Sequence, residues 1–415
     1  MKSVNVGRYS EILKIESFRN FWIGFSLSFI GDGMTRVALT WYVWEETHSE
    51  QALGLLTFMF LAPVIVGGLV AGWLLDRYDR RKVIMVDNLV RGLVMSLIPI
   101  LYWAGALELW HVYAVAGVYG LLMMISVAGG PSMVPSLVPE KQLVTANALE
   151  VVSFTLSGVV GPPIAGLLLA KYGAPNVVVI DALTYFLFVF LLTRVVIPKE
   201  DVAETEVEEE AKNSEIKTYG LADAFRLMVQ EKVLLSTTLM FMTFNIGLGM
   251  MFVWLPVYAD EGLGGGAVLY GMLLAVMAFG EVTSSLLAGS MTFKRPLGMM
   301  IIIAQIMSSL SMLIALLAQN VALMVVSLAL FGFFGAPMTS WAQTLRMKII
   351  PAAMRGRMFA LLRMLMVGAI PVGGVVAGWT MESLSKATII AMTAMFGFVP
   401  GVMGARVREL RESDG

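Results

Sequence analysis

The first long apolar stretch of the sequence carries two ionisable residues whose spacing suits proton and substrate binding. Ser28, Asp32 and Arg36 recur at every fourth position, so they lie on one face of a helix. Asp32 is about twelve residues into the stretch, roughly 18 Å along the helix axis and near the midplane of a bilayer. A carboxyl group there can bind and release a proton. The positive charge of Arg36 favours the ionised form of the Asp32 carboxyl group, and Arg36 is expected to respond when a substrate binds. The alternative is a permanent ion pair with no role in transport.

Three polar side chains in later apolar stretches are further candidates for contact with a proton or a substrate. Glu281 is about thirteen residues into its stretch, and nothing three or four positions away can neutralise it. It therefore pairs with another helix, takes up a proton or meets a cation, unless it makes a purely structural hydrogen bond. Arg363 is a candidate partner or an anion contact, with a structural role as the alternative. Asn245 is a weaker candidate, because a hydrogen bond between helices also accounts for a polar side chain at this position.

The composition indicates that the elements carrying these residues span a membrane. The chain has 415 residues, of which 58% are hydrophobic and 14% are charged, with a mean hydropathy of +0.80. A soluble globular protein has about 25% charged residues. No removable signal peptide is expected, because the sequence does not open with a charged segment, a short apolar segment and a cleavage site.

The residue types that are missing argue against several kinds of chemistry. The chain has no cysteine and two histidines, His48 and His111, which fall in predicted loops or helix ends. Disulfides, thiol catalysis, a bound metal and a histidine-dependent active site are therefore not expected. The sequence also lacks the motifs of zinc hydrolases, serine hydrolases and P-loop ATPases, so neither an enzyme nor a cofactor is expected. A net charge of −1 gives no indication of nucleic-acid binding.

Apolar stretches between polar breaks predict an all-α integral membrane protein with twelve transmembrane helices, each near the roughly 20 residues that cross a bilayer. The predicted spans are 20–45, 53–75, 83–104, 109–130, 146–170, 175–197, 233–259, 268–293, 297–318, 321–345, 357–383 and 387–405. One long polar stretch separates six spans from six. This predicts two six-helix bundles, 1–197 and 233–415, joined by a cytoplasmic linker, 198–232.

The linker contains the acidic sequence "PKEDVAETEVEEEAKNSEIK", which cannot bury a core and is typical of a flexible connection. Apolar residues at helical spacing after it predict a short amphipathic helix on the membrane surface, with a plain turn into the next span as the alternative. These residues are Leu221, Ala224, Phe225, Met228 and Val229.

The distribution of Lys and Arg predicts the orientation of the spans in a plasma or inner membrane. With both termini in the cytoplasm, 24 of the 29 basic residues lie on the cytoplasmic side and only Lys171 and Lys386 lie outside. Asp87 and Arg91, four positions apart near the inner end of the 83–104 span, are then expected to form a structural pair. Glu150 is expected to lie close enough to the cytoplasm to be solvated.

The two halves of the chain are weakly similar to each other. The stretches that begin "VPEKQLVTANAL" and "IPAAMRGRMFAL" align without gaps at an offset of 212, and Pro139 matches Pro351. The 146–170 span therefore corresponds to the 357–383 span, although a chance match is the alternative. Duplicated six-helix halves are how many secondary transporters form a substrate site between repeats.

The loop after the second span reads "GWLLDRYDRRK", and here the chain resembles the major facilitator superfamily, whose signature in this loop is G-x-x-x-D-R-x-G-R-R/K. Gly72, Asp76, Arg77, Arg80 and Arg81 match the signature. Asp79 replaces its second glycine. The stretches "GDGMTRVALTWYV", "LVPEKQLVTANAL" and "MRGRMFALL" are similar to the macrolide-efflux and siderophore-exporter branch.

The resemblance implies two pseudo-symmetric bundles and a conformational latch. Asp76 is expected to face the positive end of the helix that begins near Arg355, Gly356 and Arg357, which would stabilise an outward-open state. The alternative is that the arginines of the loop only set the topology and bind anionic lipids. The resemblance also implies that the first, fourth, seventh and tenth spans line a central cavity.

Two further features bear on the transport mechanism. The sequence "SGVVGPPIAG" partly matches an antiporter pattern on the fifth span, through Gly158, Gly161, Pro162 and Gly166, although helix packing alone explains it equally well. The fourth span lacks the arginine that drug/proton antiporters often carry there, which puts a simple transfer of their coupling mechanism in doubt.

Together these features predict a proton-coupled secondary transporter that exports amphipathic small molecules by alternating access. Within the class, a siderophore, lysophospholipid or nutrient transporter is the alternative. A membrane receptor or structural protein is the alternative from another class, and it leaves the buried charges unexplained. The expected partners are a small-molecule substrate, protons and membrane lipids, with no nucleic acid, and a monomer is expected.

Overall fold

The computed structural model describes residues 7–197, 220–290, 295–317 and 320–414, and all its regular elements are helices. Long helices are what a bilayer requires, since every backbone N–H and C=O group must be bonded within the segment. The N-terminal half contains α1 (Gly7–Ile12), α2 (Glu16–Thr47), α3 (Glu50–Arg77), α4 (Arg80–Trp103), α5 (Leu109–Leu137), α6 (Leu143–Val159), α7 (Gly161–Tyr172) and α8 (Ala174–Thr193). The C-terminal half contains α10 (Leu221–Gln230), α11 (Lys232–Val257), α12 (Gly266–Ser290), α13 (Leu297–Leu316), α14 (Val321–Ile349), α15 (Arg355–Thr380), α16 (Lys386–Arg406) and α17 (Arg408–Arg411).

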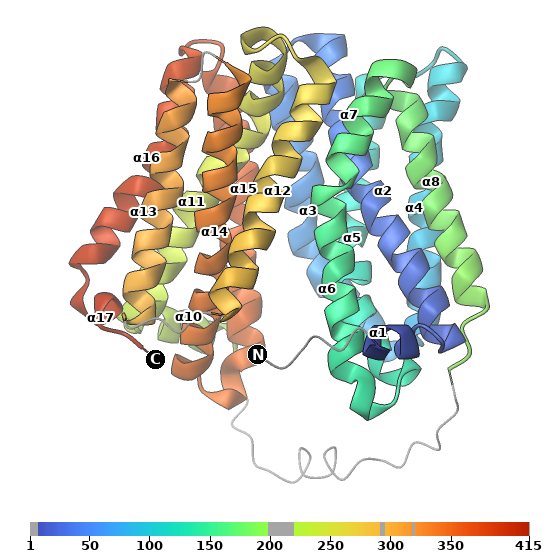
Figure 1. Ribbon diagram of the computed structural model, residues 1–415, viewed down its shortest axis with the longest axis horizontal. Helices are drawn as coiled ribbons and strands as arrows, with labels where there is room; N and C mark the ends of the chain where they lie inside the picture. Colours follow the sequence, from blue (N-terminus) through green and yellow to red (C-terminus); the bar gives the residue numbers. More distant parts are fainter. Residues whose placement is uncertain (1–6, 198–219, 291–294, 318–319, 415) are drawn as a thin grey trace.

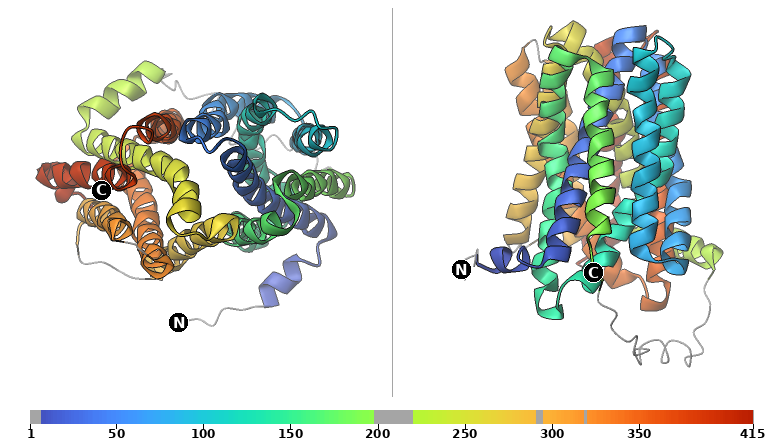
Figure 2. Two further views of the ribbon diagram at one scale, coloured as in Figure 1. Left: turned by 90° about the horizontal axis from the view of Figure 1, so that it is seen from above. Right: turned by 90° about the vertical axis from the view of Figure 1, so that its right-hand side faces the viewer.

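The long helices form two bundles that stand side by side, one from each half of the chain (Figures 1 and 2). The short helices α1, α10 and α17 all lie at one end of the molecule, which we call the terminal end. The opposite end, where α2 meets α3 and α7 meets α8, is called the far end.

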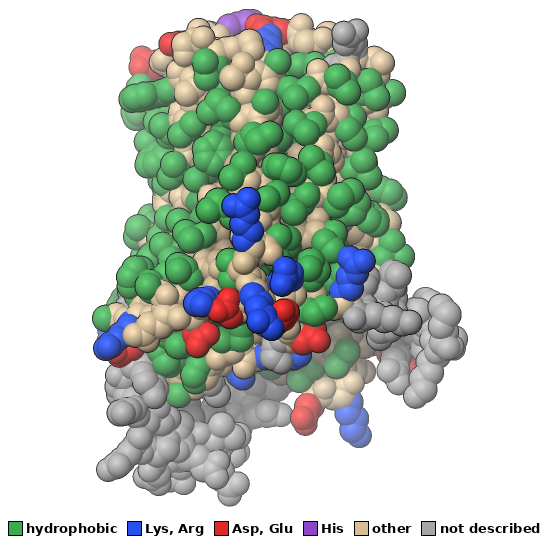
Figure 3. Space-filling model, turned by 90° about the vertical axis from the view of Figure 1, so that its left-hand side faces the viewer, with side chains coloured by type: hydrophobic (Ala, Val, Ile, Leu, Met, Phe, Trp, Pro, Cys, Tyr) green, Lys and Arg blue, Asp and Glu red, His purple; other side chains and the backbone are tan. Residues whose placement is uncertain are grey.

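The twelve-helix prediction is confirmed, with α6 and α7 together forming one span. Eleven segments in the described part of the chain are long and apolar enough to cross a membrane. The twelfth is α2, which has 32 residues and carries Asp32 and Arg36 among its apolar residues. Figure 3 shows the surface that such a fold requires, a band of hydrophobic side chains with most of the charged groups near the two ends.

The fifth span is broken between α6 and α7, next to the sequence "GPP". Pro162 and Pro163 have no backbone N–H, so the ladder of helical hydrogen bonds is interrupted there. Gly161 allows the broken span to lie against α2, because a Cβ atom on it would be 2.9 Å from the carbonyl oxygen of Ile30. The span is thus interrupted here, and the helix packing expected of its glycines is present.

The two halves touch at the far end. A Cβ atom on Gly54 of α3 would be 2.6 Å from the carbonyl oxygen of Gly374 on α15, so these backbones are in contact. The Trp44 indole of α2 also donates a hydrogen bond of 2.9 Å to the Asp260 carboxylate, which follows α11. These contacts close the space between the halves at this end.

The terminal end has no such closure between the same two helices. A Cβ atom placed on Gly72, near the end of α3, or on Gly356, at the start of α15, meets no atom within 4 Å. The ribbons of the two halves also diverge toward this end in Figure 1. A cavity of about 390 Å³ lies between α3, α5 and α15 on this side. The structure is therefore closed at the far end and has space between the halves toward the terminal end.

Candidate functional site

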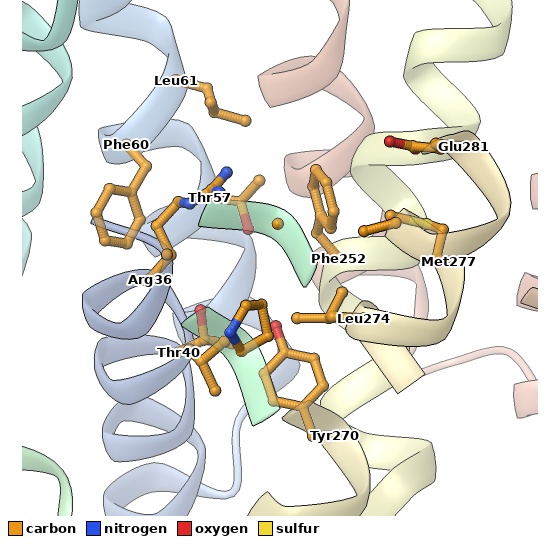
Figure 4. A pocket seen from close by; sticks show the side chains of 15 residues that line it. Arg36, Thr40, Thr57, Phe60, Leu61, Phe252, Tyr270, Leu274, Met277 and Glu281 are labelled. Atoms are coloured by element: carbon orange, nitrogen blue, oxygen red, sulfur yellow. The ribbon is translucent and has the colours of Figure 1, made fainter. Parts of the chain in front are cut away.

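A central cavity of about 240 Å³ lies between the two halves, near the closed end (Figure 4). Its wall is formed by α2, α3, α6 and α7 of the N-terminal half and by α11 and α12 of the C-terminal half. The lining residues are Gly33, Arg36, Val37, Thr40, Thr57, Phe60, Leu61, Gly158, Pro162, Phe252, Tyr270, Leu274, Met277, Ala278 and Glu281. Of the helices expected to line the cavity, the first and seventh do so, together with the second, fifth and eighth.

Two opposite charges face each other across this apolar cavity. Arg36 projects from α2 and Glu281 from α12, on opposite walls in Figure 4. Both side chains are exposed to the cavity, and neither is hydrogen-bonded or ion-paired to any residue that the structure describes. Since two uncompensated charges inside a membrane protein are costly, the cavity is suited to a molecule that supplies their partners.

Asp32 pairs with Arg91 of α4 instead of Arg36, which corrects the predicted pairing along α2. The Arg91 guanidinium is 3.5 Å from the Asp32 carboxylate, and the Tyr185 hydroxyl of α8 donates a hydrogen bond to the same carboxylate. Asp32 is only 4% exposed and does not line the cavity. The 40° between residues four apart on a helix is enough to turn Asp32 toward α4 and α8 while Arg36 faces the cavity.

Arg91 also forms the expected pair with Asp87, which is confirmed at 2.6 Å. Ser126 of α5 donates a hydrogen bond of 2.7 Å to the same Asp87 oxygen, and the guanidinium lies over the Tyr185 ring at 4.6 Å. Arg91 is therefore the centre of a buried polar cluster that joins α2, α4, α5 and α8. Removing one member of such a buried pair costs about 3–5 kcal/mol, because the partner charge is left uncompensated.

Asp181 of α8 is a buried acid that was not predicted from the sequence. It is fully buried, and the Thr35 hydroxyl of α2 donates a hydrogen bond of 2.5 Å to its carboxylate. It could have been found by the same criterion as Asp32, an acid inside a predicted span at 175–197. Glu150 of α6 was expected to be solvated, and this prediction was wrong: it is 5% exposed, because it faces Phe25 and Gly130 inside the bundle.

Glu281 also borders a second cavity of about 340 Å³, which lies within the C-terminal half between α11, α12 and α14. Phe244 and Phe331 line it with parallel rings, 5.3 Å apart at their centroids and 7° from coplanar. Asn245 lines it too and donates a hydrogen bond of 2.7 Å to the carbonyl oxygen of Met366. That contact is the helix–helix bond weighed as the alternative for Asn245.

Arg363 lies on the wall of a third, mostly apolar cavity of about 390 Å³ between α3, α5 and α15. Its guanidinium is 3.9 Å from the sulfur of Met124 on α5, in the other half of the chain. It does not pair with Glu281, so the predicted partnership is absent from this conformation, and both an anion contact and a purely structural role remain compatible with it.

The residues of the predicted latch do not meet across the halves in this conformation. Arg80 and Arg81 donate to carbonyl oxygens of their own half, at Ser132 (2.8 Å) and Leu192 (2.8 Å). Arg355 likewise binds the carbonyl oxygens that end α14. The remaining latch residues, Asp76, Arg77, Gly356 and Arg357, make no polar contact between the halves among the residues described.

The glycines of the fifth span form the contact with the eighth. A Cβ atom on Gly166 would be 2.7 Å from the carbonyl oxygen of Ala267, and one on Gly271 would be 2.3 Å from that of Pro162. Gly158 lies opposite Ala278 at 3.4 Å. This part of the "SGVVGPPIAG" sequence thus brings the two halves together beside the central cavity.

Comparison with known proteins agrees with this architecture. The model of the Major Facilitator Superfamily matches residues 21–366, so the chain belongs to that family. A solved structure of the POT family transporter PepTSo has the same fold, with a TM-score of 0.71 at 12% identity over 94% of this chain and 97% of that one.

The relatives of similar sequence are transporters. The chain is 24% identical to the staphyloferrin A transporter of Staphylococcus aureus over 77% of each protein. It is 25% identical to the enterobactin exporter EntS of Escherichia coli, over 82% of this chain and 79% of that one. It is 26% identical to macrolide efflux protein A of Streptococcus pyogenes over 44% of this chain and 45% of the relative. The predicted branch of the family is confirmed, and the protein is a multi-pass membrane transporter.

Proposed function

We propose that this protein is a proton-coupled exporter of amphipathic small molecules that carry a charged group. The observation that supports this most is the central cavity, where Arg36 and Glu281 face each other and neither is ion-paired within the described part of the chain. A molecule with an apolar body and a cationic group fits the Glu281 side, because the adjoining cavity adds the stacked rings of Phe244 and Phe331. Aromatic faces attract cations, so carboxylate and rings favour the same ligand.

A second candidate substrate is an anionic small molecule, and the relatives named as a staphyloferrin A transporter and an enterobactin exporter supply the compounds to test. Arg36 and Arg363 both have guanidinium groups directed into cavities, without an acidic partner among the residues described. Arginine binds carboxylates through two parallel hydrogen bonds, so each of these residues suits a substrate that carries a carboxylate. The two candidates share the transport mechanism and the Arg36 side of the central cavity, and they differ in the charge of the substrate.

The test of this function uses the purified protein in liposomes with an imposed pH gradient. We expect a radiolabelled macrolide, a cationic amphipathic probe, to accumulate against its concentration gradient, with protons moving in the opposite direction. Accumulation of enterobactin instead would support the anionic candidate. Transport that depends on concentration alone, with no response to the pH gradient, would contradict proton coupling.

We also propose that the terminal end faces the cytoplasm, because the basic residues gather there. Ser214→Cys, in a chain without cysteine, is expected to react with an impermeant thiol reagent only after the cells are permeabilised. Ala106→Cys, in the exposed loop between α4 and α5 at the far end, is the matched control and is expected to react in intact cells. The opposite pattern would reverse the orientation. With the terminal end inside, the conformation described is inward-open.

The latch at Asp76 is proposed to form only in the outward-open state, when the start of α15 approaches the end of α3. Asp76→Asn is expected to favour the inward-open state by about 0.3–1 kcal/mol, roughly a two- to fivefold change in population. Spin labels at Ser136→Cys and Thr344→Cys, exposed positions on the two halves at the terminal end, measure that population as a distance distribution. Glu140→Gln, an exposed acid nearby, is expected to have no effect. An unchanged distribution in Asp76→Asn would exclude the latch.

A further inference from the structure

The buried cluster of the N-terminal half contains more negative than positive charge. Asp32, Asp87 and Asp181 are 4%, 2% and 0% exposed, and Arg91, the cation that contacts this group, is 1% exposed. Three ionised carboxylates and one guanidinium would leave a net charge of −2 inside the bundle. Uncompensated charge of this kind is strongly unfavourable in a low-dielectric interior, so at least one carboxyl group must bind a proton.

The contacts of the three carboxyl groups show which one that is. Arg91 donates a hydrogen bond of 2.6 Å to Asp87 and forms an ion pair with Asp32 at 3.5 Å. A guanidinium has donors only, so it supports the ionised form of both. Asp181 has two hydroxyl neighbours instead. The Thr35 hydroxyl donates to its carboxylate at 2.5 Å, and the Thr184 hydroxyl lies 3.3 Å from the carboxylate while donating to the Asp181 backbone carbonyl oxygen at 2.7 Å.

Hydroxyl groups differ from a guanidinium in a way that matters for proton binding. A threonine hydroxyl donates to an ionised carboxylate and, after rotation, accepts from a protonated one. Asp181 therefore keeps hydrogen-bonded partners in both states, whereas Asp32 and Asp87 would each lose a favourable contact with Arg91 on taking up a proton. The backbone of α2 also packs closely against the Asp181 carboxyl group, because a Cβ atom on Gly31 would be 2.2 Å from the Oδ1 atom of Asp181.

We infer that Asp181 is a proton-binding site of this protein, held between the hydroxyl groups of Thr35 and Thr184 and separate from the substrate cavity. The charged and titratable groups around it are Asp32 from α2, Arg91 and Asp87 from α4, Tyr119 from α5 and Tyr185 from α8 itself. The only basic residue of α7, which also packs against α8, is Lys171 at its exposed end.

The position of Asp181 suits coupling to the substrate cavity. Thr35 precedes Arg36 on α2, so one helix carries both the hydroxyl that binds Asp181 and the guanidinium that faces the cavity. Asp181 is also seven residues from the start of α8, about 10 Å from the far end at 1.5 Å per residue. A proton entering an exporter from the outside reaches that end of the bundle first. This coupling role rests on the proposed function, whereas proton binding does not.

Infrared spectroscopy of the purified full-length protein tests proton binding without any substrate. A protonated carboxyl group has a C=O stretch that an ionised one lacks, and we expect one such band at neutral pH to disappear in Asp181→Asn. Thr35→Val is expected to shift the same band, because it removes the bonded hydroxyl. Glu150→Gln, which removes another buried acid, and Asp223→Asn, which removes an exposed one on α10, are expected to leave this band in place.

Retention of every protonated-carboxyl band in Asp181→Asn, or loss of this band in Glu150→Gln, would overturn the inference. Transport of a radiolabelled macrolide in liposomes then tests coupling. Accumulation driven by a pH gradient is expected to fall about 5- to 150-fold in Asp181→Asn, the range of typical coupling between sites. Accumulation equal to that of the wild type would overturn the coupling role. A wild-type protein that shows the band without responding to the pH gradient would contradict the proposed function and leave the proton site intact.

Discussion

Asp32→Asn is expected to bind substrate but to lose accumulation driven by a pH gradient. The Asp32 carboxylate is held by Arg91 and by the Tyr185 hydroxyl. Its negative charge is one of the two that make ionisation of Asp181 unfavourable. An amide keeps the size and the hydrogen bond from Tyr185 but removes the charge, so one of the two negative charges that favour a proton on Asp181 is lost.

The expected loss of accumulation in Asp32→Asn is about 5- to 150-fold, corresponding to a coupling free energy of 1–3 kcal/mol. It is measured as uptake of a labelled macrolide into liposomes under a pH gradient. Exchange of labelled for unlabelled macrolide between equal pools needs no proton movement, so it should survive and serves as the control for folding and binding. If Asp32→Asn concentrates the probe at the native rate, Asp32 is not a coupling group and Glu281 is the next candidate.

Glu281→Gln is expected to weaken binding of a cationic amphipathic substrate about 10- to 150-fold. The reason is the loss of a charge-assisted contact, worth about 1.5–3 kcal/mol, at a site where the substrate would be the only partner of the carboxylate. Since Glu281 borders both the central cavity and the cavity lined by Phe244 and Phe331, the loss should affect ligands in either.

The measurement is the dissociation constant of a macrolide at a pH where its amine is protonated. Glu382→Gln, an exposed acid at the far end, provides a matched control with the same change in net charge. Unchanged affinity in Glu281→Gln together with lost pH-driven uptake would show that Glu281 carries a proton instead of contacting the cation. Unchanged affinity and unchanged uptake would remove it from the site.

Asp32 and Glu281 show which part of the candidate site could be predicted from the sequence. Both were identified because an ionisable group inside a long apolar stretch is costly and needs a partner. Glu281 lies in the cavity and has no ion-pair partner among the residues that the structure describes. Asp32 has a partner of opposite charge, as expected, but that partner is Arg91, 59 positions away in the chain.

The sequence by itself determined the elements of this protein. The spans can be predicted from the lengths of the apolar stretches, because a helix that crosses a bilayer satisfies every backbone hydrogen bond within its own segment. The break at Pro162 and Pro163 follows from the missing N–H groups. The family follows from "GWLLDRYDRRK", a local pattern that needs no knowledge of packing. Each of these depends on neighbours along the chain.

Only the tertiary structure decided which polar groups meet. The spacing of Asp32 and Arg36 allowed an ion pair along α2, but the rotation of that helix against α4 and α8 turns one toward Arg91 and the other toward the cavity. Asp181 reaches Thr35 across 146 positions of sequence. When a span is apolar on nearly all of its faces, the sequence periodicity does not determine how the helix is rotated about its own axis. That rotation is fixed by close packing of side chains and glycines between helices, which involves both bundles at once and is therefore a property of the folded molecule.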